Sequence, residues 1–387
     1  MGFESRQVAS LPSSEIRKIF NAANAMTDVV HLEIGDPDFN TPEHIVEAAY
    51  RAALAGATHY TATAGTPEVR EAVAAKFLRD NGIACDPASE VIVSVGAIGA
   101  VFAAVMAVTN PGDEIIVTDP NWPNYVSHIM LPGGRLVPLP LREENGFRAS
   151  LEDIRAVATN RTKALIINSP NNPTGSVLSK EELLEIGEFC AAKKILVISD
   201  EVYEKIIYGK KHFSLGSIPE FKESVVTVNS LSKTYAMTGW RLGFACGPKP
   251  VIGNMVKVQE AATSCVSAVV QKAAVAALNG PQEPVNRMVT AYARRREFFV
   301  DGLNKIPGFS CLKPDGAFYA YPNVKAFGMP SFELAMALLK EAGVATVHGS
   351  GLGQFGEGYL RMSFATSDDN LREALRRLEG FARSRLG

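Results

Sequence analysis

The sequence predicts an α/β fold whose larger part contains a mainly parallel β-sheet. Short apolar runs rich in Val and Ile recur through the middle of the chain, and several are apolar nearly throughout, as expected of strands covered on both faces. Helical stretches such as 180–194 separate these runs, and an alternation of strands with helices is typical of parallel sheets. The expected strands cover residues 91–95, 114–117, 164–168, 195–199 and 225–228.

The chain length and composition indicate a globular protein of two or three domains. The chain has 387 residues, and a domain contains about 150 residues. The hydrophobic fraction of 47% and the charged fraction of 21% predict a large core. The net charge of −2 indicates neither a nucleic-acid partner nor binding to an anionic membrane.

The pattern of the chain changes from about residue 286 onward. A charged helix is expected around residues 292–297, followed by two strand-like pieces and a closing helix. We therefore expect a large α/β domain over residues 48–285 and a small α+β domain formed by residues 1–47 and 286–387. The strand-like pieces cover 316–321 and 358–364, and the closing helix covers roughly 369–383.

The cysteines, the N-terminus and the histidines argue against secretion, a membrane span and a metal site. The five cysteines are odd in number and show no CxxC spacing, which indicates reduced core residues in a reducing compartment. The N-terminus is charged early and lacks an apolar signal segment, so we expect a cytoplasmic protein. The apolar run 97–108 is too short to span a bilayer and predicts a buried helix. The six histidines show no metal-binding spacing, so we expect no metal.

Four of the expected strands are followed by residues suited to chemistry. Gly96, Asn172, Asp200 and Lys233 each come after the end of a different apolar run. Since open α/β sheets bind ligands at the carboxyl ends of their strands, we expect these four segments to meet at one edge of the sheet. The sequence therefore predicts one composite site.

Lys233 is the first candidate for a catalytic residue. A lysine forms a Schiff base with an aldehyde only as the neutral amine, so its neighbours must hold its pKa down. Ser230 and Ser232 precede it and Arg241 follows it, and these groups can bind a phosphate. The arrangement indicates an aldehyde cofactor with a phosphate tail. An exposed lysine in a Ser/Thr-rich loop is the alternative.

Asp200 is the second candidate. A carboxylate at the end of an apolar strand is costly to bury unless it meets a cation. A protonated pyridine nitrogen is a suitable partner, and its proton makes the ring an electron sink. An aspartate that caps the following turn is the alternative.

Two motifs carry a resemblance to a known family. The segment 229–243 around Lys233 and the Asn-Asn-Pro-Thr-Gly string at 171–175 resemble the class I/II aminotransferases, which are pyridoxal-phosphate (PLP) enzymes of fold type I, similar to aspartate aminotransferase. The resemblance extends from about residue 30 to about residue 380. It implies PLP as the cofactor, a large PLP-binding domain and a smaller α+β domain.

The resemblance also assigns the contacts of the cofactor ring. It implies that Asp200 holds the pyridine nitrogen and that Tyr203 and Asn172 donate to the ring oxygen. Trp122, one of two tryptophans, matches an aromatic residue that stacks on the ring. A core tryptophan is the alternative.

A strand that runs into glycines and then into a helix presents free backbone N–H groups, which bind phosphate. The segment 94–99 has this form, but its third loop position is Ile98, where relatives often carry a polar residue. The resemblance therefore leaves backbone contacts there and no polar side-chain contact. In the family, a tyrosine at the position that Tyr60 matches reaches the cofactor phosphate bound in the neighbouring subunit. The resemblance therefore implies a homodimer with shared active sites. The expected phosphate contacts are Gly96, Ala97, Ile98, Ser230, Ser232, Arg241 and Tyr60.

Arg361 is the candidate for binding the substrate. An arginine between apolar neighbours on a predicted strand requires a bidentate anion. The resemblance assigns it, with Asn172, to the α-carboxylate of an amino acid or a 2-oxo acid, and it places Gly35 in a loop that closes over the substrate beside Trp122. The implied reaction is ping-pong transamination, with Lys233 as general base and acid.

Two other functions stay open on the sequence alone. Another reaction on the same scaffold, such as that of a C–S β-lyase or a racemase, would share every residue above except the substrate contacts. A non-catalytic PLP- or ligand-sensing protein would require a DNA-binding segment, and the roughly 30 residues before the resemblance are too few for one.

The side chain of the substrate is expected to be neutral or aromatic rather than acidic. A dicarboxylate requires a second cation, and no lysine or arginine in a recognisable motif supplies it. Trp122, Ile98, Phe39 and Tyr125 form an apolar pocket if all of them face it. For His348 we expect at most a pocket contact, and we expect the glycine-rich segment 349–353 to be a flexible loop near the mouth of the site.

Overall fold

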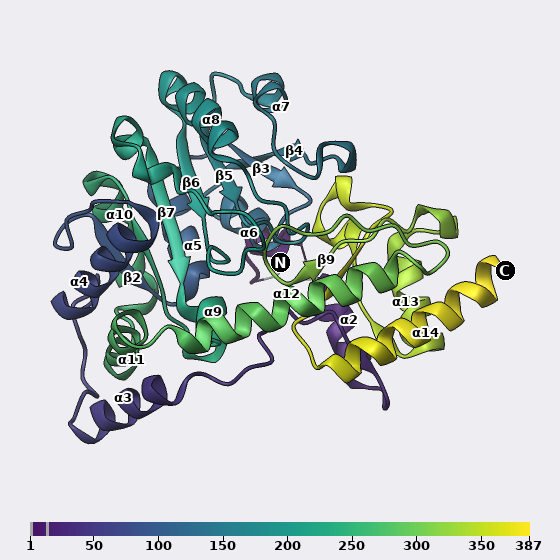
Figure 1. Ribbon diagram of the computed structural model, residues 1–387. Helices are drawn as coiled ribbons and strands as arrows, with labels where there is room; N and C mark the ends of the chain where they lie inside the picture. Colours follow the sequence, from purple (N-terminus) through teal and green to yellow (C-terminus); the bar gives the residue numbers. More distant parts are fainter. Residues whose placement is uncertain (1–2, 13–14) are drawn as a thin grey trace.

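A computed structural model of the protein describes residues 3–12 and 15–387. Residues 1–2 and 13–14, which belong to the expected small-domain segment 1–47, lie outside the described residues. Figure 1 shows a wide α/β layer with helices on both faces and a smaller layer beside it, bridged by the long helix α12 (Glu283–Leu303).

The large layer contains a seven-stranded sheet with the order β2-β8-β7-β6-β5-β3-β4. Strands β3, β4, β5, β6 and β7 run parallel to one another, whereas β8 is antiparallel to both of its neighbours. Because β2 and β7 both oppose β8, they run in the same direction and end at the same edge. The strands are β2 (Val91–Ser94), β3 (Glu114–Asp119), β4 (Arg135–Pro140), β5 (Thr162–Asn168), β6 (Leu196–Asp200), β7 (Val225–Ser230) and β8 (Gly243–Cys246).

The mainly parallel α/β sheet expected from the sequence is confirmed, with two strands that the sequence pattern did not reveal. β4 contains two prolines and β8 is a four-residue strand that begins with glycine. Proline and glycine weaken a strand pattern, and β4 lies at the edge of the sheet, where proline is tolerated.

Both faces of the sheet are covered because successive residues of its central strands enter different cores. Ile115 and Val117 pack with α5 and α10, whereas Ile116 packs in the core below α7 and α8. This is why the strands read as continuous apolar runs. The covering helices are α3 (Glu43–Leu54), α4 (Pro67–Lys76), α5 (Gly96–Val108), α6 (Asn124–Met130), α7 (Leu151–Val157), α8 (Lys180–Lys193), α10 (Lys249–Thr263) and α11 (Ala268–Asn279).

The helix expected over 180–194 is α8, and its start has a local cause. The Ser179 side chain accepts from the Glu182 backbone N–H, and the Glu182 side chain accepts from the Ser179 backbone N–H. This capping box satisfies two N–H groups that have no partner inside the helix.

The smaller layer surrounds a second core formed by the C-terminal part of the chain and its N-terminal segment. Within the expected strand 316–321 only β9 is extended, because Ala317 has a left-handed φ of 56° and turns the chain. The helix α12 starts with Val285 in the core of the large layer and continues from Met288 in the second core. The remaining elements are α1 (Arg6–Ala9), α2 (Glu15–Asn24), β1 (Val30–His31), β9 (Tyr319–Ala320), α13 (Ser331–Ala342), β10 (Val344–Ala345), β11 (Val347–His348), β12 (Leu360–Ser363) and α14 (Asp368–Leu386). The domain boundaries at 47/48 and 285/286 stay a prediction.

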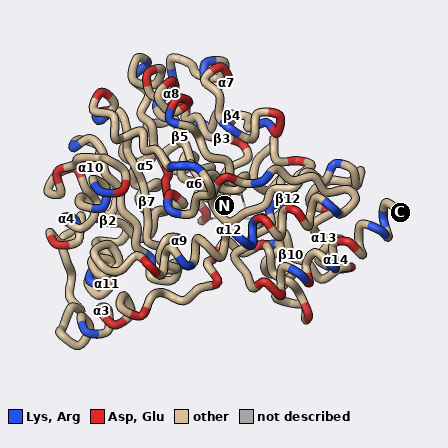
Figure 2. Tube along the Cα trace, in the orientation of Figure 1, with Lys and Arg blue, Asp and Glu red and all other residues tan. Residues whose placement is uncertain are grey.

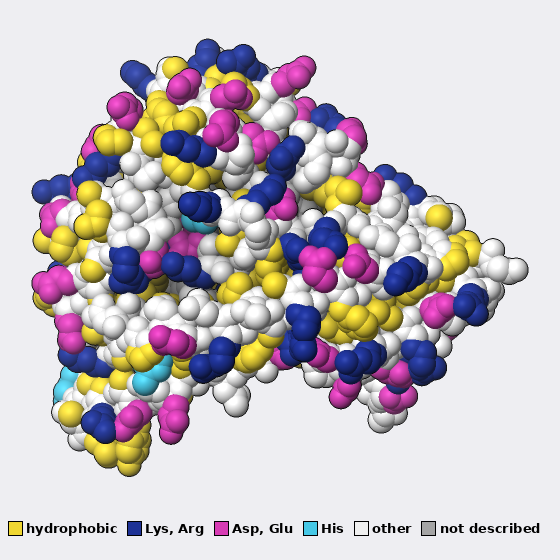
Figure 3. All heavy atoms as spheres, in the orientation of Figure 1, with side chains coloured by type: hydrophobic (Ala, Val, Ile, Leu, Met, Phe, Trp, Pro, Cys, Tyr) yellow, Lys and Arg dark blue, Asp and Glu magenta, His cyan; other side chains and the backbone are white. Residues whose placement is uncertain are grey.

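The surface carries both signs of charge. Figure 2 shows Lys and Arg interspersed with Asp and Glu along the whole trace, and the face in Figure 3 shows the same mixture around scattered apolar side chains. Over residues 3–12 and 15–387, none of the helices combines the length and the apolar character that a membrane span needs.

Candidate active site

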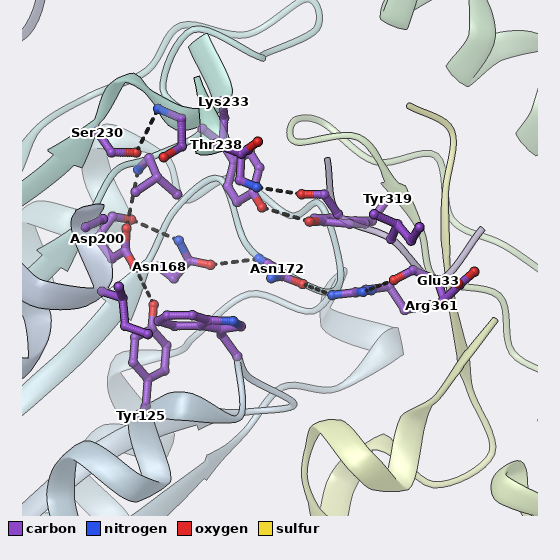
Figure 4. Close-up of a pocket in the computed structure, with 18 of the residues that line it drawn as sticks. Glu33, Tyr125, Asn168, Asn172, Asp200, Ser230, Lys233, Thr238, Tyr319 and Arg361 are labelled. Carbon is purple, nitrogen blue, oxygen red and sulfur yellow. Dashed lines mark hydrogen bonds between the residues drawn. The ribbon is translucent and has the colours of Figure 1, made fainter. Parts of the chain in front are cut away.

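A cavity of about 400 Å³ opens at the carboxyl edge of the sheet, between the two layers. Figure 4 shows its side chains converging from β5, β6 and α9 on one side and from β9 and β12 on the other. Its wall contains Phe20, Glu33, Ile34, Gly35, Ala97, Ile98, Trp122, Tyr125, Asn168, Asn172, Asp200, Val202, Tyr203, Ser230, Ser232, Lys233, Thr238, Arg241, Tyr319 and Arg361.

Lys233 projects into this cavity from the short helix α9 (Leu231–Thr234), directly after β7. Its surroundings lower the pKa of the amine to about 8, mainly through burial, and Arg361 and Arg241 lower it further while Asp36 opposes them. The Nζ atom donates to the carbonyl oxygen of Gly35 at 2.5 Å. Lys233 is therefore held as an amine that is far easier to deprotonate than an exposed lysine.

Asp200 lies at the end of β6 and is buried at one end of the cavity. Burial raises the pKa of its carboxyl group to about 6. Tyr125 donates its hydroxyl to Oδ2 at 2.6 Å, and the Val202 N–H reaches Oδ1 at 3.4 Å. Among the described residues no lysine, arginine or histidine pairs with it. The site therefore offers a buried carboxylate that can receive a cation.

Arg361 is buried at the other end of the cavity, on β12. Its Nη1 donates to Asn172 Oδ1 at 3.1 Å and its Nη2 donates to the backbone oxygen of Glu33 at 2.7 Å, while its buried Nε has no partner. No carboxylate of the described chain forms an ion pair with this guanidinium. A buried cation in this state is suited to an anionic group of a ligand.

A third group of residues surrounds the start of α5. Gly96 has a left-handed φ of 69°, and a Cβ atom there would lie 2.6 Å from Nη2 of Arg241. The Arg241 guanidinium also donates from Nη1 to the Thr238 carbonyl at 2.6 Å. Ser230 Oγ accepts from the Ser232 N–H at 3.3 Å, and both serines line the cavity. A helix N-terminus, two hydroxyls and an arginine that pairs with no carboxylate of residues 3–12 and 15–387 form a suitable cradle for a phosphate.

The structure brings most of the predicted residues together. Of the predicted residues outside the phosphate loop, Gly35, Trp122, Asn172, Asp200, Tyr203, Ser230, Ser232, Lys233, Arg241 and Arg361 all line the cavity, as do Ala97 and Ile98. Gly96 lies next to the guanidinium of Arg241. Tyr60 does not line the cavity and is 90% exposed, so its role stays a prediction.

Two residues and one segment considered for the periphery of the site do not line the cavity. Phe39 does not face the cavity, because its ring packs edge-on against Tyr292 and beneath Arg295. His348 does not line it either, since its Nδ1 bonds to Ser350 and the Gly351 N–H and so caps the next turn. That turn, Gly349–Leu352, is a 3₁₀-helix that lines a neighbouring hollow beside Asp119 rather than the cavity with Lys233.

Several wall residues were not recognised in the sequence. Asn168 bridges two segments, because its Nδ2 donates to the Asp200 carbonyl and its Oδ1 accepts from the Asn172 N–H at 2.7 Å. Its position at the end of β5 was a usable signal. Tyr319 and Phe20 had no such signal, since one lies on a two-residue strand and the other on the helix α2 far from every motif. Tyr125 was expected only as an apolar wall residue, and the hydrogen bond from its hydroxyl to Asp200 was not predicted.

A separate polar cluster lies behind the sheet edge. Carboxylate and imidazole atoms of Glu201, Glu204 and His212 lie within 4.8 Å of one another. Lys76, which is also buried, forms an ion pair with Glu204 and donates to Asn81. The lysine already supplies the positive charge for these carboxylates, and the absence of a metal from the protein stays a prediction.

The fold and the cavity together define a class of protein. A mainly parallel sheet that presents a lysine of lowered pKa, a buried carboxylate without a cationic partner among the described residues, and a phosphate cradle in one cavity is the arrangement of a fold-type-I PLP enzyme. The unpaired carboxylate fits the pyridine nitrogen, and the space that a Cβ at Gly96 would fill lies next to Arg241.

Residues 27–378 match the model of the family "Aminotransferase class I and II", and the chain belongs to that family. An aspartate aminotransferase of Pyrococcus abyssi is 44% identical over 96% of each chain, and an aromatic-amino-acid aminotransferase of Thermococcus litoralis is 42% identical over 95% of each chain. The solved aspartate aminotransferase of Thermus thermophilus with maleate superposes with a TM-score of 0.94 at 40% identity, covering 98% of this chain and 100% of that one. The chain is a PLP-dependent aminotransferase that moves an amino group between an amino acid and a 2-oxo acid.

Proposed function

We propose that this aminotransferase prefers neutral and aromatic L-amino acids as donors. The observation that carries the proposal is the charge of the cavity wall. Among its described residues the cations are Lys233, Arg241 and Arg361, and each is already assigned to the cofactor or to the α-carboxylate. Relatives named for aspartate and for aromatic amino acids occur at similar identity, so the residues of this pocket are the better guide.

The side-chain end of the cavity is apolar. Ile98, Trp122, Ile34 and Phe20 all line it, and Trp122 meets Tyr125 edge-on at 5.4 Å between ring centroids. Such a wall stabilises an apolar substrate side chain by removing its surface from water. A second carboxylate placed here would lose its hydration without gaining a cation.

The proposed roles of the residues follow from their positions. PLP, when bound, supplies a conjugated ring that accepts the electron pair left at the substrate Cα. Asp200 would hold the pyridine nitrogen, Tyr203 and Asn172 the ring oxygen, and Trp122 would stack on the ring. The phosphate would be held by Gly96, Ala97, Ile98, Ser230, Ser232, Arg241 and Tyr60 of the partner protomer.

Substrate binding and proton transfer are assigned to three residues. Arg361 and Asn172 would orient the α-carboxylate, with Gly35 closing the loop beside it. Lys233, once free, would take the proton from the substrate Cα with Nζ and return it on the cofactor side, as a general base and then an acid. An amine whose pKa is lowered to about 8 can carry out both steps near neutral pH.

We further propose a cytoplasmic homodimer with shared active sites. Tyr60 is 90% exposed, which suits a residue that acts in a partner. On α3 the residues Val46, Tyr50 and Leu54 are exposed at helical spacing and form one apolar stripe. The five cysteines are all free, which supports a reducing compartment.

The test of the reaction uses the purified protein with PLP and one amino acid at a time, without any 2-oxo acid. Conversion of the cofactor to its amine form, with release of the matching 2-oxo acid, is expected for phenylalanine, methionine and alanine more than for aspartate. Aspartate as the best donor would contradict the proposed preference. An Ile98→Lys variant should shift the ratio of kcat/KM toward aspartate.

The test of the dimer mixes two inactive variants, Lys233→Ala and Tyr60→Ala. If Tyr60 acts across the interface, each mixed dimer contains one complete site and activity returns on mixing. If Tyr60 acts within its own chain, the mixture stays as inactive as its parts. If Tyr60 has no role in the site, Tyr60→Ala is active by itself. Light scattering reports the oligomeric state independently.

A further inference from the structure

Tyr319 connects the two ends of the active site, and no role for it follows from the family motifs used above. It lies on β9, which pairs with β12 so that Tyr319 faces Ser363, two residues after Arg361. The Tyr319 side chain is 1% exposed and lines the cavity. Figure 4 shows it between Lys233 and Arg361.

The ring of Tyr319 supports the guanidinium of Arg361. The Arg361 Cζ atom lies 4.6 Å from the centroid of this ring. A guanidinium at this distance is attracted to the negative face of the ring, and the attraction grows when both groups are buried. The ring therefore helps to fix the plane of the group that is proposed to bind the α-carboxylate.

The hydroxyl of Tyr319 contacts a residue proposed to bind the cofactor. Its Oη lies 2.8 Å from the Oη of Tyr203. On its other side a Cβ atom at Gly35 would lie 2.3 Å from the same oxygen, so only glycine fits there. The Gly35 carbonyl in turn accepts from Lys233. The hydroxyl is thus confined between Tyr203 and the loop that contacts the catalytic lysine.

The number of protons decides the direction of this hydrogen bond once the cofactor is present. A tyrosine hydroxyl has one proton to donate. If Tyr203 donates that proton to the ring oxygen of PLP, its oxygen can only accept from Tyr319. A hydroxyl that accepts one hydrogen bond becomes a stronger donor of the next.

We propose that Tyr319 is a positioning residue for transamination: its ring holds Arg361 in place and its hydroxyl donates to Tyr203, which donates to the cofactor. This inference rests on the proposed roles of Arg361 and Tyr203. It adds a second connection between the carboxylate site and the cofactor, separate from the contact between Arg361 and Asn172. A carboxylate bound at Arg361 reduces the positive charge over the Tyr319 ring, and so makes its hydroxyl a weaker donor.

The first test is a spectral titration of PLP bound at Lys233, which does not depend on turnover. Hydrogen bonds donated to the ring oxygen of PLP withdraw charge from it. They therefore lower the pKa at which the visible absorption band of the bound PLP changes. Tyr319→Phe should therefore raise this pKa by up to about 0.5, a part of the effect of losing one neutral hydrogen bond, because Tyr319 reaches the ring oxygen only through Tyr203. Tyr321→Phe is the matched control, because Tyr321 is equally buried, lies on the same segment and does not line the cavity. The control should leave the pKa unchanged.

The second test combines Tyr319→Phe with Tyr203→Phe. If the hydroxyl of Tyr319 acts through Tyr203, its loss has no further effect in the Tyr203→Phe background. Equal shifts in both backgrounds would overturn the inference, and so would a Tyr319→Phe protein that titrates like the control. If Tyr203→Phe alone leaves the spectrum unchanged, the proposed role of Tyr203 fails instead.

The third test separates the ring from the hydroxyl. Tyr319→Phe keeps the ring and should change the Kd of a monocarboxylate inhibitor less than twofold. Tyr319→Leu removes the ring and should weaken that Kd by about 3- to 10-fold. Equal affinities in the two variants would refute the support of Arg361 by the ring. Thermal melts of all variants identify any that fail to fold.

Discussion

The substitution Arg361→Lys tests the proposed carboxylate site most directly. Lysine keeps the positive charge but replaces a planar fork by a single ammonium group. In the structure the fork already donates to Asn172 Oδ1 at 3.1 Å and to the Glu33 carbonyl at 2.7 Å, and the buried Nε has no partner. One ammonium cannot satisfy these two acceptors and also hold a carboxylate in a fixed plane.

The size of the effect follows from the bonds that are lost. A hydrogen bond to a charged group contributes about 1.5–3 kcal/mol, and each 1.4 kcal/mol corresponds to about a factor of ten. Loss of one of the two bonds to the α-carboxylate therefore predicts a decrease in kcat/KM of about 10- to 100-fold for amino acids. Arg361→Ala should cost more, because it also leaves the buried Asn172 amide and Glu33 carbonyl without their donor.

The assay compares two inhibitors that differ only in the group that Arg361 is proposed to bind. Binding of 3-phenylpropionate and of 3-phenylpropanamide is followed through the visible band of the enzyme with PLP. Arg361→Lys should weaken the acid by the factor above and leave the neutral amide within about twofold. Equal losses for both compounds would refute the reasoning, because Arg361 would then shape the cavity without recognising the carboxylate.

Three further outcomes are expected. Gly96→Ala should lower the affinity for PLP about tenfold, because the new Cβ would lie 2.6 Å from Arg241 Nη2 and would displace this phosphate donor, whose hydrogen bond contributes about 1.5 kcal/mol; fluorescence titration measures it. Uptake of PLP by the apoprotein should accelerate with pH and level off above a midpoint near 8, because Lys233 is neutral above a pKa lowered to about 8 from 10.5. Since folding depresses this pKa, the stability linked to Lys233 is present above pH 10.5 and is lost as the pH falls through 8. Lys76→Met should lower the free energy of unfolding in urea by about 3–5 kcal/mol, because it leaves Glu204 buried without its cation.

Each of these outcomes has a control or a contrary result. Gly99→Ala meets its nearest side chain at 3.7 Å and should not change PLP binding, so equal weakening by both variants would exclude the contact with Arg241 as the cause. A midpoint for PLP uptake near 10 would show that Lys233 behaves as an exposed amine. Lys272→Met removes a surface pair with Glu68 and should cost less than about 1 kcal/mol. A similar cost for Lys76→Met would contradict a buried ion pair.

The composite site could be predicted because one rule of sheet geometry brings distant segments together. Asn172, Asp200 and Lys233 follow β5, β6 and β7, and parallel neighbours end at the same edge. Gly96 joins them although β8 is the one strand of the described sheet with which β2 pairs, because two antiparallel pairings restore its direction. The apolar runs identified these strands even where β8 itself was not recognised.

The contacts that prepare the site could not be predicted. Arg361 is held by the backbone carbonyl of Glu33, more than 300 residues earlier in the chain, and a carbonyl group is the same in every residue. Phe39 was considered for the apolar pocket on the condition that it faces the cavity, but its ring packs against Tyr292 on α12. Which of two apolar surroundings a ring enters depends on the path of the whole loop.

The sequence by itself determined the fold class, the cofactor and the residues at the ends of the strands, because these follow from local patterns and short motifs. Only the tertiary structure decided the pKa of Lys233, the burial of the Arg361 Nε without a partner in the described part of the chain, and the contact between Tyr319 and Tyr203. Burial and hydrogen-bond distance depend on which segments pack together after folding. Groups far apart in the chain acquire their chemistry from that packing.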